Sequence, residues 1–127
     1  MAIIPCAGMD KALGSVARAC AFKVVEKLRP DKAVLVCIPS LVAGVKPYSE
    51  IVNTCPSIPI DGCAERCATK IAAKNGARIK ARILIPESVQ KHNLKPKSAS
   101  DIGPDGERLA ERLAEEIAAE IDKLLGK

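Results

Sequence analysis

Hydrophobic residues along the chain fall into two patterns that recur in turn. Short apolar runs predict β-strands at residues 2–5, 33–38, 57–60 and 78–85. Apolar residues three and four positions apart, together with helix start and stop signals, predict helices at residues 10–28, 48–54, 64–75, 86–92 and 104–125. Strands and helices that alternate in this way predict an α/β protein, a single three-layer α/β/α domain with a mostly parallel sheet of about four strands.

Three of these elements have patterns that indicate where they lie in the domain. Residues 33–38 are apolar throughout, which is typical of a central strand covered by helices on both faces. Residues 78–85 alternate basic and apolar side chains before turning apolar, which predicts an edge strand with one solvated face. The last helix carries an apolar stripe of Leu109, Leu113 and Ile117, and we expect this stripe to pack against the rest of the domain.

Composition and charge exclude several classes of protein. The 127 residues are 48% hydrophobic and 28% charged, as in an ordinary globular domain, and we expect residues 1–127 to form one. No apolar stretch reaches the roughly 18 residues of a membrane span. One Phe, one Tyr and no Trp leave almost no surface on which bases could stack. Residues 66–97 hold nine Lys or Arg against Glu87 alone, a pattern we interpret as a solvated surface rather than a nucleic-acid site.

Cysteines follow the predicted strands at the point where each strand ends. Cys6 follows the first strand, Cys37 lies at the end of the second, and Cys63 comes shortly after the third. Because the carboxyl ends of parallel strands share one edge of the sheet, we expect these thiols to lie close together. Cys67 would join them if the next helix begins near Cys63, since residues four apart share a helix face. Four thiols in one place form a closed tetrahedral zinc site.

The other polar candidates give weaker indications. Cys20 falls on the apolar stripe of the first helix and is expected in the core, and Cys55 lies away from any strand end. Asp61 stands beside Gly62, as in a turn. His92 is the only histidine and lies among polar residues, as in a solvated loop. No set of nucleophile, histidine and carboxylate can be assembled, so the sequence leaves open whether the protein is an enzyme.

Three short strings resemble those of the DGC-domain family, small prokaryotic proteins labelled zinc-binding on account of four shared cysteines. They are Pro5-Cys6-Ala7-Gly8, Val36-Cys37-Ile38-Pro39 and Ile60-Asp61-Gly62-Cys63, and the likeness extends over nearly the whole chain. By position, the resemblance implies that Cys6, Cys37, Cys63 and Cys67 are the metal ligands. These are the same four thiols that the strand ends select.

Three functional classes therefore remain, and the first is favoured. It is a protein that holds one zinc ion. We expect this protein in the cytoplasm, because a reducing compartment keeps cysteines free to bind metals. The second is a thiol redox or sulfur-transfer protein that uses Cys63 and Cys67. The third is a nucleic-acid binder that uses the basic segment. The choice between zinc and iron, the partner and the oligomeric state stay open.

Overall fold

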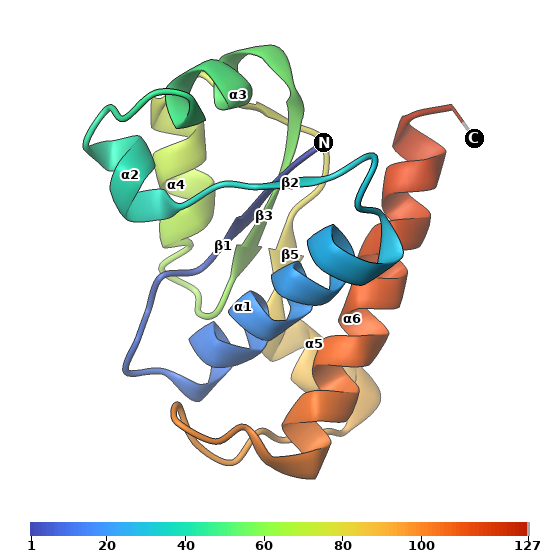
Figure 1. Cartoon of the computed structure of the whole chain (residues 1–127). Helices are drawn as coiled ribbons and strands as arrows, with labels where there is room; N and C mark the ends of the chain where they lie inside the picture. Colours follow the sequence, from blue (N-terminus) through green and yellow to red (C-terminus); the bar gives the residue numbers. More distant parts are fainter. Residues whose placement is uncertain (127) are drawn as a thin grey trace.

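A computed structural model describes residues 1–126 and shows an α/β fold built on a parallel sheet (Figure 1). The sheet has five strands, β1 (Ala2–Pro5), β2 (Val34–Leu35), β3 (Pro56–Asp61), β4 (Arg78–Ile79) and β5 (Ile83–Leu84). Their order is β2-β1-β3-β4, β5 also pairs with β3, and every pair is parallel. The expected α/β class with a parallel sheet flanked by helices is thus confirmed.

Helices cover both faces of this sheet. One face carries α1 (Ala12–Lys23), a π-helical turn η1 (Val24–Leu28), α5 (Ile85–His92) and α6 (Gly103–Leu124). The opposite face carries α2 (Ile38–Val42), α3 (Tyr48–Thr54) and α4 (Cys67–Lys74). Consecutive side chains of a strand point to opposite faces, so Ile3 packs with the first group while Ile4 packs with the second.

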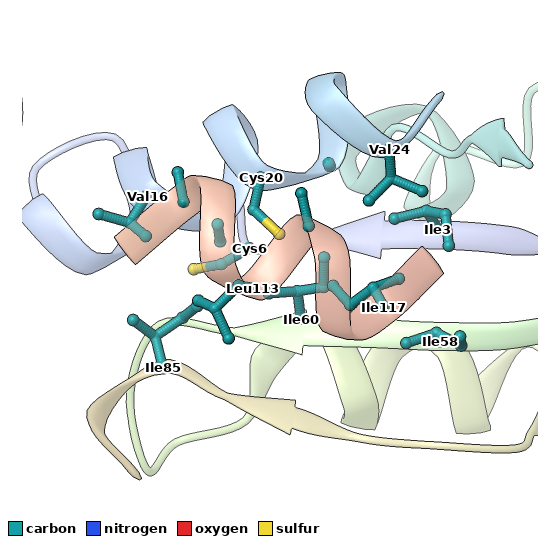
Figure 2. Close-up of a cluster of buried hydrophobic side chains, with 14 of the residues drawn as sticks. Ile3, Cys6, Val16, Cys20, Val24, Ile58, Ile60, Ile85, Leu113 and Ile117 are labelled. Carbon is teal, nitrogen blue, oxygen red and sulfur yellow. The ribbon is translucent and has the colours of Figure 1, made fainter. Parts of the chain in front are cut away.

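The larger hydrophobic core lies between the sheet and the pair α1 and α6 (Figure 2). Leu109, Leu113 and Ile117 of α6 are at most 1% exposed, which confirms the apolar stripe expected to pack against the domain. Each such side chain contributes about 1.5–3 kcal/mol when it is removed from water. Figure 2 also shows Cys20 of α1 directed into this cluster, where the sequence placed it.

The prediction that residues 33–38 form a central strand is wrong. Only Val34 and Leu35 are in β2, which pairs with β1 alone and therefore lies at the edge of the sheet. The centre is formed by β1 and β3, whose register runs from Ala2 opposite Ser57 to Pro5 opposite Ile60. Helix α2 already begins at Ile38. The apolar side chains of residues 33–38 instead pack into the hydrophobic clusters between the sheet and its helices.

The opposite edge of the sheet is divided into two short strands. Both β4 and β5 pair only with β3, so the expected edge position of residues 78–85 is confirmed. Residues 80–82 interrupt the strand, and the Lys80 N–H still donates to the Ser57 carbonyl at 2.9 Å. Within residues 1–126, no helix is long and apolar enough to span a membrane.

Candidate functional site

The strand order places three cysteine-bearing strand ends side by side. Cys6 follows β1 directly, and its N–H donates to the Ile60 carbonyl of β3 at 2.8 Å. Cys37 comes two residues after β2, and Cys63 comes two residues after β3. Because β1 lies between β2 and β3, Cys6 stands at the middle strand of the three. The carboxyl edge of the sheet is therefore the candidate site, as in other open α/β folds.

The loop that carries Cys6 is fixed to the start of α1. Cys6 is 8% exposed, and its Sγ accepts the Gly8 N–H at 3.3 Å. The Arg18 guanidinium donates to the Cys6 carbonyl at 3.1 Å and to the Gly8 carbonyl at 3.2 Å. Sequence reasoning gave Arg18 no role. The signal in the sequence that could have indicated this role is the spacing between Gly14 and Arg18, which are four residues apart and therefore lie on one helix face.

Two glycines, Gly14 and Gly62, let the backbones of this edge touch one another. A Cβ on Gly14 would overlap the carbonyl oxygen of Gly8, so only glycine fits at this point of α1. A Cβ on Gly62 would lie 3.0 Å from the Gly14 backbone nitrogen, closer than an ordinary contact. The Cys6 loop, the start of α1 and the turn before Cys63 are thus packed backbone against backbone.

Asp61 caps the helix that follows it. Its side chain is 1% exposed, and Oδ1 accepts the backbone N–H of Ala68 at 2.8 Å and that of Thr69 at 3.4 Å. Its Oδ2 accepts the Thr69 hydroxyl. Arg66, the residue before α4, is left-handed with φ 55° and caps nothing with its side chain. Asp61 therefore supplies the N-terminal cap of α4 from the end of β3.

The helix that carries Cys67 begins one turn later than the sequence predicted. Cys67 is the first residue of α4, and Cys63 lies in a turn closed by the Arg66 N–H donating to the Cys63 carbonyl at 3.1 Å. Cys63 is half-buried and Cys67 is exposed. The expectation that both thiols share one helix face is therefore wrong. The cap from Asp61 fixes the helix start at Cys67, and the cap comes from the end of β3 rather than from the residue before the helix, where a cap is usually found.

Cys37 and Cys6 line the same pocket. Cys37 is exposed and immediately precedes α2, where hydrogen bonding from the Ser40 hydroxyl, and then from its backbone N–H, lowers the pKa of the Cys37 thiol. The pocket has a volume of about 280 Å³ and lies between the end of β1, β2 and α1. Its polar lining comes chiefly from Arg18, while Met9 and Phe22 contribute apolar surface. Cys63 and Cys67 do not line it.

The remaining cysteines lie apart from this edge. Burial raises the pKa of the Cys20 thiol to about 12, and the nearby charge of Glu116 adds to the effect, so Cys20 is a core residue. Cys55 is half-buried and directly precedes β3, so it lies at the end of that strand opposite Cys63.

The four thiols selected from the sequence are not assembled into one ligand set. In residues 1–126, no three Cys, His, Asp or Glu side chains are arranged to hold a metal ion. The structure therefore brings three cysteine-bearing strand ends to one edge, and it places Cys6 and Cys37 in one pocket. It leaves Cys63 and Cys67 on the neighbouring turn.

The comparisons with known proteins agree with the short strings at these strand ends. The family model described as DGC domain matches residues 2–117, which include all six cysteines and every strand of the sheet. No curated protein and no solved structure matches the chain. With a match over nearly its whole length, this chain belongs to the DGC-domain family.

Proposed function

We propose that this protein binds one zinc ion through Cys6, Cys37, Cys63 and Cys67. The observation that carries the proposal is the strand order β2-β1-β3, because it sets the three cysteine-bearing ends next to one another with Cys6 at the middle strand. Thiolates are the ligands that structural zinc sites use most, and four of them complete a tetrahedral shell. The donor set therefore fits zinc in its chemistry, and three of its members follow neighbouring strand ends.

Zinc binding requires that the exposed thiols of Cys37 and Cys67 move toward the thiol of Cys6. Cys6 is buried and hydrogen bonded through its N–H, its carbonyl and its Sγ, so its position is set by the fold. Cys37 and Cys67 are exposed, and no three metal-binding side chains within residues 1–126 are yet together. Metal would thus draw the start of α2 and the turn before α4 toward the end of β1, and binding would be coupled to local ordering.

The negative charge of such a zinc site can be balanced by positive side chains near it. Four thiolates around a divalent ion leave a charge of −2, which needs positive groups close by. Arg18 lines the pocket beside Cys6, and Arg66 lies in the turn between Cys63 and Cys67. A shell of four sulfur ligands leaves no position for an activated water, so the role is structural or metal handling rather than hydrolysis. We place this function in one domain over residues 1–127, in the cytoplasm.

Metal analysis of the full chain, purified without chelator under reducing conditions, tests the proposal. We expect about one zinc per chain, and a chelator should lower the melting temperature because the metal joins three strand ends. Cys63→Ser should remove the metal and abolish the response to chelator. Cys55→Ser is the matched control, since Cys55 lies at the opposite end of β3 and should keep full metal content. Absence of stoichiometric metal in the wild-type protein would refute the proposal.

A second candidate is a thiol redox or sulfur-transfer pair formed by Cys63 and Cys67. Its support is accessibility, since Cys67 is exposed, Cys63 is half-buried and one tight turn joins them. Thiol counting separates the two functions. A redox pair predicts a metal-free protein in which mild oxidation removes two thiols and links Cys63 to Cys67, as peptide mapping would show. Zinc binding predicts that both thiols are protected until the chelator is added.

A further inference from the structure

Three sulfur atoms belong to residues that line the pocket at the ends of β1 and β2. Two are the thiols of Cys6 and Cys37, and the third is the thioether of Met9. Apart from Arg18, the other lining residues are aliphatic, aromatic or proline. Met9 is 75% exposed, the most exposed of the large hydrophobic side chains in residues 1–126. A sulfur-rich, otherwise apolar pocket with an exposed methionine at its surface is an unusual combination for packing alone.

We propose that this pocket binds a soft monovalent metal ion, Cu(I), through the thiolates of Cys6 and Cys37 and the thioether of Met9. Soft thiolate and thioether ligands select Cu(I) over harder divalent ions. This site goes beyond the zinc site, because it needs neither Cys63 nor Cys67. It would stand if no zinc were found.

Zinc and Cu(I) require different numbers of ligands at this edge of the sheet. A structural zinc site requires four ligands in a tetrahedron. Within residues 1–126 no three Cys, His, Asp or Glu side chains form a metal-binding group, yet two thiols share a pocket to which Met9 adds a thioether. Cu(I) has a filled d shell and is stable with two or three sulfur ligands. The pocket therefore holds the ligand types that Cu(I) needs, whereas a four-cysteine zinc site also requires Cys63 and Cys67, which do not line it.

The charges in the pocket also suit a monovalent ion. Binding converts two thiols to thiolates, releases two protons to solvent and leaves a charge of −1 on the complex. The Arg18 guanidinium lines the same pocket and supplies one positive charge. The Gly8 N–H already donates to Cys6 Sγ at 3.3 Å and would stabilise that thiolate. Cys6 is 8% exposed, and low exposure to water strengthens the interactions of its sulfur.

An anaerobic competition titration of the full-length, reduced, metal-free protein tests this site. Cu(I) is supplied as its complex with bicinchoninate, whose colour reports the copper that the protein removes. We expect one Cu(I) per chain for the wild type and loss of competition for Cys37→Ser. Met9→Leu keeps the volume but removes the sulfur, and should weaken binding by at least about tenfold, since the loss even of an outer-shell partner of a metal site costs about that much. Both positions are exposed, so the variants should keep the circular dichroism spectrum of the wild type.

Cys63→Ser and Met9→Leu separate this site from the zinc site. Cys63→Ser should bind Cu(I) as the wild type does while losing zinc, and Met9→Leu should keep zinc. Wild-type affinity for Cu(I) in Met9→Leu would overturn the assignment of the thioether. Equal losses of Cu(I) binding in Cys37→Ser and Cys63→Ser would place the copper in a four-cysteine site and overturn the proposal. Failure of the wild type to compete with bicinchoninate would also overturn it, whatever its zinc content.

Discussion

Replacing Asp61 by Ala should be among the most damaging single changes to this fold. The substitution leaves the backbone N–H groups of Ala68 and Thr69, and the Thr69 hydroxyl, without their acceptor at a site that is 1% exposed. A hydrogen bond to a charged group contributes about 1.5–3 kcal/mol, and Asp61 accepts two such bonds, from the Ala68 N–H and from the Thr69 hydroxyl, besides the longer one from the Thr69 N–H. We therefore expect the free energy of unfolding to fall by about 3–5 kcal/mol. A domain of this size has roughly 10 kcal/mol in total.

Urea unfolding of the metal-free protein, followed by far-ultraviolet circular dichroism, measures this loss without contribution from a metal site. Thr69→Val removes the hydroxyl alone and should cost about 1.5–3 kcal/mol, because that hydroxyl bonds to a charged group. Asp31→Ala is the control, because Asp31 is an exposed aspartate in a turn and should unfold as the wild type does. If Asp61→Ala lost less than about 1 kcal/mol, the carboxylate would not be the cap that holds α4.

Three further predictions test the thiols, the charges and the glycine contacts. Cys20 should resist iodoacetamide at pH 8 until the chain unfolds, because burial raises its pKa to about 12; mass spectrometry of the alkylated protein measures this. Hydrogen bonding from Arg29 lowers the pKa of Asp122 from 3.8 to about 2, so its contribution to stability is present above pH 3.8 and is lost toward pH 2. Urea unfolding at these pH values should show a smaller acid loss in Asp122→Asn. Gly14→Ala should lower the melting temperature, because its Cβ would overlap the Gly8 carbonyl oxygen.

The sequence predicted best those elements whose patterns are local. The stripe of Leu109, Leu113 and Ile117 determines both that α6 is a helix and which side of it is buried. Helix α3 begins and ends at the predicted residues, 48 and 54. Each of these follows from side-chain spacing within one segment, so no knowledge of distant residues was needed.

The errors involve contacts between different elements, which the spacing within one element does not encode. Residues 33–38 have the composition of a central strand, but strand order depends on β1 pairing with β3 across more than fifty residues. His92 was expected in a solvated loop, yet it ends α5, and its Nε2 lies 2.9 Å from a Glu116 carboxylate oxygen on α6. At the candidate site, Cys6, Cys37 and Cys63 follow neighbouring parallel strands as predicted, although β2 ends earlier than expected and the later start of α4 depends on the Asp61 cap.

The central position of β1 has a consequence for how the chain is made. Residues 2–5 are synthesised well before their partner β3, which ends at Asp61, so β1 waits for more than fifty further residues before it can pair. Helix α6, which covers Ile3, Ile58 and Ile60, follows only at residues 103–124. Pairing between distant segments folds slowly, and exposed apolar strands promote aggregation. We therefore expect the nascent chain to need protection by chaperones until α6 has emerged.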